Sequence, residues 1–256
     1  MEIFWNYVRD QRFNQIQGFA PNEVECQLGQ PEVEAITQWY EIPRALFNVT
    51  APEEGERIYD AKGNLLGVYE ECLAAGIRFP LCRFYRELFH MYNITLAQLI
   101  PNSCRLIVGF LLRCREVDVP STVRLWSYFY VFKIGSGDMK GWIYFSRRLN
   151  VPSIFADSGP PAVHGWKPRY FFLATTSQLG IPKAWNKPNA EMLPKPALSV
   201  EEERYVVRLR SWSDGTPRLM SYLSPARIAW SLATRSGQFV MSDTEVARSG
   251  KCAQYL

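Results

Sequence analysis

The segment that most constrains the fold is residues 106–112 (LIVGFLL), an apolar run that lies between two arginines. Asn102 or Ser103 can cap a helix that begins just before this run and continues to about Glu116. Such a helix is apolar on most of its sides, so we expect other elements to surround it. The run is too short to cross a bilayer, which takes about 20 residues.

Helical spacing of apolar residues predicts three further helices, near residues 66–77, 82–92 and 122–132. The second of these would place Leu88 and Met91 on one face. Together with the apolar helix they form a predicted helical core over about residues 66–132.

The pattern changes after Gly135. Residues 141–146 (GWIYFS) and 164–175 are rich in aromatic residues and predict two strands that could pair with each other. Residues 199–210 and 224–234 predict two more helices, and Ser199 starts a capping signal for the first. The expected fold class is therefore α+β: a mainly helical core, a small antiparallel aromatic-rich sheet at about residues 138–175, and a helical C-terminal part.

Charge is unevenly distributed along the chain, although the net charge is only +4. Residues 1–60 carry eleven Asp/Glu and four Lys/Arg, whereas residues 121–200 carry three Asp/Glu and ten Lys/Arg. The acidic front and the basic middle could attract each other within one fold, or the basic part could face an anionic partner. The first interpretation needs no partner and is favoured.

Five phrases in register carry a family resemblance. They are residues 67–70 (GVYE), 74–81 (AAGIRFPL), 96–103 (LAQLIPNS) leading into 105–111 (RLIVGFL), 141–146 (GWIYFS) and 165–172 (GWKPRYFF). In this order they resemble the plant gypsy-type transposon domain, also labelled a transposase domain. The resemblance is strongest over residues 38–175. It implies a protein encoded by, or descended from, a plant long-terminal-repeat element, and it implies no catalytic residues.

The resemblance and the composition together divide the chain into four expected parts. Residues 1–43 form an acidic N-terminal segment, and residues 44–175 form the gypsy-type transposon domain. Residues 176–200 form a Pro-rich linker, and residues 201–256 form a helical C-terminal segment. No signal peptide precedes them, so we expect an intracellular protein, nuclear or cytoplasmic, with no membrane partner.

A basic and aromatic segment is the candidate binding site. A basic sheet with exposed rings can neutralise phosphates and stack bases, so it would bind nucleic acid. The alternative is that the rings belong to the core and the cations to its solvated edge. The candidate residues are Arg147, Arg148, Lys167, Arg169, Trp142 and Trp166.

Catalytic chemistry has weaker support in the sequence. Asp157-Ser158-Gly159 matches the phrase of retroelement aspartic proteases, but a surface turn is favoured there because two prolines follow. A metal-dependent nuclease would need three carboxylates, for which Asp118, Asp138, Asp157 and Glu191 are the candidates. The six cysteines and two histidines show no zinc spacing, so we expect no metal and no cofactor.

Three functions therefore stay open. The favoured one is a non-enzymatic structural or assembly module, gag-like, of a plant retroelement-derived protein, with self-association as its expected interaction. The first alternative is a nucleic-acid-binding accessory domain. The second is a true enzyme, either a transposase-type nuclease or an aspartic protease.

Overall fold

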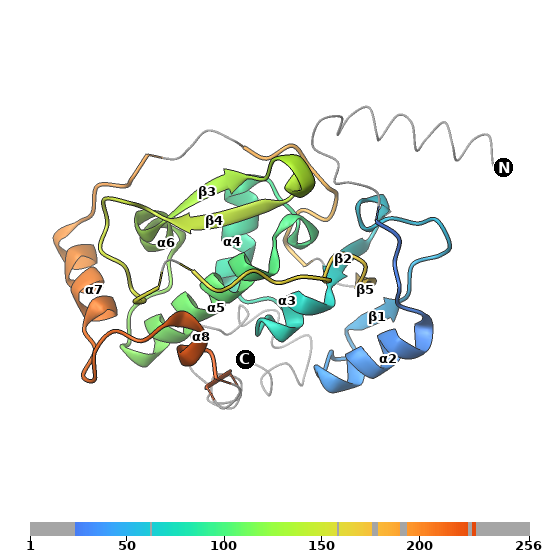
Figure 1. Ribbon diagram of the computed structural model, residues 1–256, viewed down its shortest axis with the longest axis horizontal. Helices are drawn as coiled ribbons and strands as arrows, with labels where there is room; N and C mark the ends of the chain where they lie inside the picture. The colour runs from blue at the N-terminus through green and yellow to red at the C-terminus, as the bar shows by residue number, and fades with distance from the viewer. Residues whose placement is uncertain are drawn as a thin grey trace.

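The computed structural model describes residues 24–61, 63–157, 159–175, 179–189, 194–224 and 227–228. Helices pack with two small antiparallel sheets, which confirms the α+β class (Figure 1). The helices are α2 (Gln30–Trp39), α3 (Glu70–Ala74), α4 (Arg83–Tyr92), α5 (Pro101–Glu116), α6 (Val123–Phe129), α7 (Val200–Arg210) and α8 (Leu219–Tyr222), with short 3-10 turns η1 (Ile58–Asp60), η2 (Leu96–Gln98) and η3 (Gly137–Met139). The strands are β1 (Phe47–Thr50), β2 (Leu65–Tyr69), β3 (Tyr130–Ile134), β4 (Ile143–Arg147) and β5 (Tyr170–Thr175).

Helix α5 is the central helix that the apolar run predicts. Twelve of its 16 residues are buried. It packs against α3, α8 and strand β4. The helix begins at Pro101, one residue before the expected cap, because proline at the first helical position needs no hydrogen-bond acceptor and already has a helical φ.

Helix α4 agrees with its predicted range, but one predicted core residue is wrong. Its buried side chains follow two rows spaced by four, namely Phe84, Leu88 and Tyr92 with Tyr85 and Phe89 beside them. Met91 falls outside both rows and is 38% exposed.

The helix expected over residues 66–77 is mostly wrong. Leu65–Tyr69 forms strand β2, and only the short helix α3 follows it. Leu66 and Val68 alternate with Gly67 and are buried in either conformation, so their apolar character could not distinguish strand from helix. Pairing with β5 decided it.

The sequence suggested that the strand at residues 141–146 pairs with the one that became β5. This pairing is wrong. Strand β5 is the middle strand of a sheet with order β1-β5-β2, antiparallel to both neighbours. Strand β1 supplies the third strand of this sheet at residues 47–50, where the sequence predicted no strand. Strand β4 instead pairs with β3, which begins at Tyr130 and takes Phe132 out of the helix predicted to end there.

The β3–β4 hairpin lies across the start of α5 (Figure 1). The Phe145 backbone N–H donates to Ser103 Oγ at 2.9 Å, and the Ile100 N–H donates to the Ile143 carbonyl at 3.1 Å. These bonds connect the hairpin to the buried N-terminal turn of the central helix.

The described C-terminal helices, α7 and α8, lie toward the same end of the molecule (Figure 1). Helix α7 begins at the predicted capping box, where the Glu202 N–H donates to Ser199 Oγ at 3.2 Å. Most of the helix predicted over residues 224–234 lies outside the described residues, and α8 precedes it.

Within the predicted linker Trp185 is buried against the core. The four domain boundaries stay predictions. In the part of the chain that the structure describes, no helix is long and apolar enough to cross a bilayer.

Candidate functional site

The two tryptophans of the predicted binding site lie in the core. Trp142 is 1% exposed and Trp166 is 6% exposed, with ring centroids 5.5 Å apart in an edge-to-face arrangement. Trp142 Nε1 donates to Tyr69 Oη at 3.1 Å, and the Tyr69 ring packs edge-on against Trp166 at 4.6 Å. In this conformation neither ring offers a face on which a base could stack.

Two of the predicted basic residues are engaged beside this aromatic cluster. Lys167 Nζ lies 4.4 Å from the centroid of the Trp142 ring and donates to the Asp138 carbonyl at 2.6 Å. Arg169 Nε lies 2.5 Å from Glu70 Oε2, and this hydrogen bond raises the pKa of the arginine. These contacts connect the start of β5 to α3 and η3.

A groove of about 570 Å³ lies next to the cluster, at the N-terminus of α5. Its walls are mainly apolar, and Asn102, His164 and Lys167 supply its polar side chains. Asn102 Nδ2 is already bonded to the carbonyls of Pro160 and Pro161, at 3.2 and 3.1 Å. Among the described residues that line the groove, the histidine is accompanied by no serine and no carboxylate.

The other two predicted cations lie at the far end of β4. Arg147 ends the strand, whereas Lys167 contacts Trp142 just before the strand begins, so the two pairs are separated by about 16 Å of extended chain. The four predicted basic residues therefore do not form one patch. Whether either pair binds nucleic acid stays a prediction.

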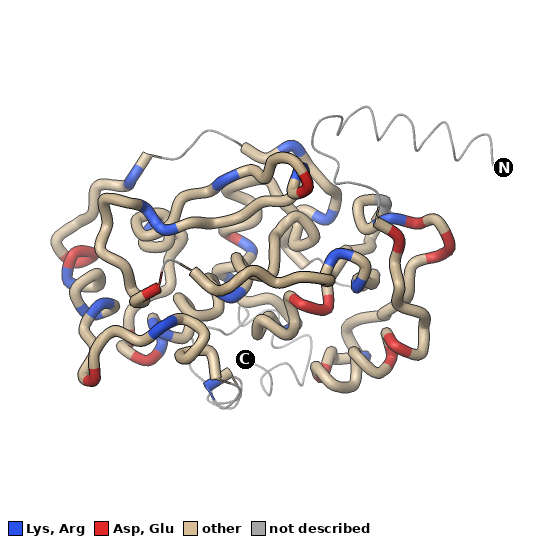
Figure 2. Tube along the Cα trace, in the orientation of Figure 1, with Lys and Arg blue, Asp and Glu red and all other residues tan. Residues whose placement is uncertain are grey.

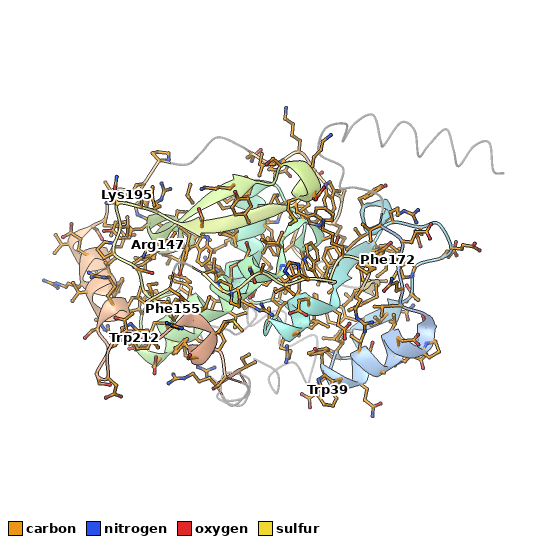
Figure 3. The ribbon with its side chains drawn as sticks, viewed as in Figure 1. Trp39, Arg147, Phe155, Phe172, Lys195 and Trp212 are labelled. Atoms are coloured by element: carbon orange, nitrogen blue, oxygen red, sulfur yellow. The ribbon has the colours of Figure 1, made fainter. Side chains whose placement is uncertain are left out.

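Arg148 lies near a cation that sequence reasoning missed, because the two side chains contact neighbouring residues of α6. Lys195 Nζ lies 4.7 Å from the centroid of the Tyr128 ring on α6. Arg148 Nε donates to the carbonyl of Ser127, the preceding residue of the same helix, at 2.8 Å. We call Arg147, Arg148 and Lys195 the basic cluster; Figure 3 shows Arg147 and Lys195 at the same end of the molecule. No local sequence pattern predicts the position of Lys195, because it contacts a residue 67 positions away along the chain.

An exposed apolar side chain adjoins the basic cluster. Leu149, which directly follows Arg148, is 92% exposed. The neighbouring Arg124 of α6 is paired with Glu202 at 2.8 Å, so it is partly neutralised and is not counted in the cluster.

Acidic residues outnumber basic ones in the segment around α2, although Figure 2 shows further acidic residues at the other end of the molecule. Residues 24–61 contain eight Asp/Glu and two Arg. Helix α2 buries Val33 and Ile36 and turns its other side to solvent, where Trp39 is 81% exposed. We call Glu34, Trp39 and Glu41 the acidic face; all three are exposed.

The acidic front and the basic middle interact where the charge of Glu32 adds to the Glu70 hydrogen bond in raising the pKa of Arg169, whereas the ion pairs below lie elsewhere. Glu25 of the front pairs with Arg57 of the same segment at 3.1 Å. In the basic middle, Arg124 and Arg169 pair with glutamates of α7 and α3. Glu34 and Glu41 of the acidic face and Lys195 of the basic cluster are exposed, whereas Arg147 and Arg148 are half-buried.

The candidate catalytic carboxylates do not come together. Asp157 Oδ1 accepts a hydrogen bond from the Leu219 N–H at 3.1 Å, which gives this carboxylate a structural role at the start of α8. Asp118 adopts a left-handed turn after α5, Asp138 lies in η3, and Glu191 falls outside the described residues. Among the described side chains, no three of His, Cys, Asp or Glu are grouped to hold a metal ion.

The segment from β2 to β3 contains the helical core, which is formed by α3, α4, α5 and α6. Residues 68–134 match the family model described as "putative gypsy type transposon". This gypsy-type segment is about a quarter of the chain, and the match supports a retroelement origin. No curated protein and no solved structure matches the chain significantly.

The gypsy-type segment supplies the scaffold of the molecule. Phe84, Phe110 and Trp126, one from each of α4, α5 and α6, pack with ring centroids 5.4–6.1 Å apart and are at most 2% exposed. The basic cluster and the acidic face both lie outside the matched residues. The two charged surfaces therefore belong to the parts of the chain that flank the matched segment.

Proposed function

We propose that this chain is a non-enzymatic assembly module of a plant retroelement-derived protein that acts inside the cell by associating with copies of itself. The observation that supports self-association is a pair of surfaces of opposite charge that lie far apart on the molecule: the acidic face on and after α2, and the basic cluster toward the other end (Figure 3). Two separate surfaces of opposite charge on one molecule attract surfaces of its copies.

Sedimentation velocity of the purified chain at increasing concentration tests this function. We expect the weight-average sedimentation coefficient to rise with concentration at low salt. Raising the ionic strength should weaken the association, because exposed charges are screened beyond about 8–10 Å at 0.1–0.15 M salt. A chain that stays monomeric at every concentration and salt would overturn the proposal.

Nucleic-acid binding is the second candidate function, and the basic cluster is the observation that favours it. Lys195 lies over the partly exposed Tyr128 ring there, and Arg148 bonds to the carbonyl of the preceding residue, Ser127. Fluorescence polarisation with a labelled single-stranded RNA, measured over a range of salt concentrations, tests it. Replacing Arg147 and Lys195 by Glu should lower the salt dependence of log K, by a slope of about 0.7 for each lost phosphate contact. Charge reversal at Lys167 and Arg169 tests the other predicted pair separately.

A further inference from the structure

We infer that copies of this chain join head to tail, with the acidic face of one copy against the basic cluster of the next. The inference rests on the proposed self-association and identifies the surfaces and the geometry that would produce it. Each surface combines charge with one exposed apolar side chain, and the two are complementary in both respects.

The acidic face is an unpartnered side of a helix. Val33, Ile36 and Thr37 turn the other side of α2 into the core, which leaves Glu34 and Trp39 directed at solvent. Glu41 follows in a left-handed turn with φ of 53° and is also exposed. A tryptophan that is 81% exposed is the kind of side chain that anchors protein interfaces once it is covered.

The basic cluster offers a fitting counterpart. Arg147 and Lys195 supply positive charge opposite the two glutamates, and an indole ring is the best acceptor for a cation–π contact. Leu149, 92% exposed beside them, supplies an apolar surface that the Trp39 ring could cover. Covering both side chains removes two large exposed apolar groups from water in one contact.

The positions of the two surfaces determine the kind of assembly. Figure 3 shows Trp39 and Arg147 toward opposite ends of the long axis, so one copy cannot bring its own two surfaces together. Because the surfaces differ, the contact is heterologous, and each added copy still presents one free surface of each kind. Such contacts produce open chains, or rings if the rotation between copies closes.

Two complementary variants test the inference. The face variant, Glu34→Lys with Trp39→Ser, lacks the acidic face and keeps the basic cluster. The cluster variant, Arg147→Glu with Leu149→Ser, has the opposite defect. We expect each alone to self-associate at least about tenfold more weakly than the unaltered chain, because like charges now face each other. Their equimolar mixture should form dimers that do not grow further, since only one unaltered pair of surfaces remains.

Control measurements distinguish a failure of the proposed surfaces from a failure of the proposed self-association. Asp214→Lys, an exposed change outside both surfaces, should associate as the unaltered chain does. Far-UV circular dichroism and thermal unfolding of all variants show whether each is folded. If the unaltered chain associates but the mixture of folded variants stays monomeric, the surfaces are wrong while the proposed function stands. If the unaltered chain is monomeric throughout, both fail, and loss of RNA binding in the cluster variant alone would assign the basic cluster to nucleic acid.

Discussion

Arg113 and Arg208 each bind the C-terminal end of the other's helix. Arg113 Nε donates to the Leu209 carbonyl at 3.1 Å, and its Nη2 donates to the carbonyls of Arg208 and Ser211 at the end of α7. Arg208 Nη2 donates in return to the Val117 carbonyl after α5. The last carbonyls of a helix lack intrahelical donors and carry partial negative charge, so two cations satisfy both helix ends.

This relationship predicts unequal costs for two arginine substitutions. Arg113 is 4% exposed and also pairs with Glu116 at 2.8 Å, so Arg113→Met removes the side-chain donor of the Leu209 and Ser211 carbonyls and one of the donors of the Glu116 carboxylate. We expect the free energy of unfolding to fall by about 1–3 kcal/mol, measured by urea denaturation. Arg210→Met, at an exposed position of the same helix end, should change it by less than about 0.5 kcal/mol. Equal effects would mean that Arg113 does not secure α7.

Two glycines of the hairpin connection should differ in what they tolerate. A Cβ at Gly135 would collide with the Met139 backbone, which is held because the Trp142 N–H donates to the Met139 carbonyl at 3.1 Å. Gly137 has φ of 57° but open space around it. We expect Gly135→Ala to cost about 3 kcal/mol through overpacking, and Gly137→Ala about 1 kcal/mol through the left-handed conformation alone. Thermal and urea unfolding compare them, and the reverse order would contradict the hairpin geometry.

The hydrogen bond between Trp142 and Tyr69 should be measurable by removing one oxygen atom. Tyr69→Phe leaves the buried Trp142 Nε1 without its acceptor, so we expect a loss of about 1–3 kcal/mol in the free energy of unfolding. Near-UV circular dichroism should report the change around the indole. Tyr144→Phe, half-exposed on the hairpin, is the matched control and should be nearly neutral. An unchanged urea midpoint in Tyr69→Phe would show that the bond adds nothing.

Alkaline pH should destabilise the fold in part through Cys82. Burial raises the pKa of this thiol from 9.0 to about 11. The folded chain therefore keeps a proton that the unfolded chain loses, so the stabilisation is complete below pH 9 and decreases as the pH rises toward 11. The two-unit difference corresponds to a loss on the order of 2–3 kcal/mol over this window.

The measurement is the free energy of unfolding in reductant at several pH values between 9 and 11. Cys82→Ala should show a shallower decline than the unaltered chain over this range. Some decline should persist in the variant, because burial also raises the pKa of Cys104 and Tyr85. Coincident slopes for the two chains would contradict a buried, protonated Cys82.

Local sequence signals determined the helices whose positions depend on their own apolar rows and capping residues. Helix α4 follows its row of apolar residues, and α7 begins at the Ser199 capping box. Thr122 caps α6, where its Oγ1 accepts a hydrogen bond from the Leu125 N–H at 3.2 Å. These features depend on residues within one or two helical turns, so they can be predicted from neighbouring residues in the sequence. The charge asymmetry between the front and the middle is likewise a property of the sequence.

The tertiary structure decided which apolar segments became strands and which side chains became accessible. Leu66 and Val68 fit a helix or a strand equally, and β5, about a hundred residues away, selected the strand. Burial of Trp142 removed a ring that the sequence offered for stacking, while Lys195 came to lie over the Tyr128 ring across 67 residues of chain. Pairing and burial depend on contacts between distant segments, and periodicity along the chain contains no information about which distant segment will be the partner.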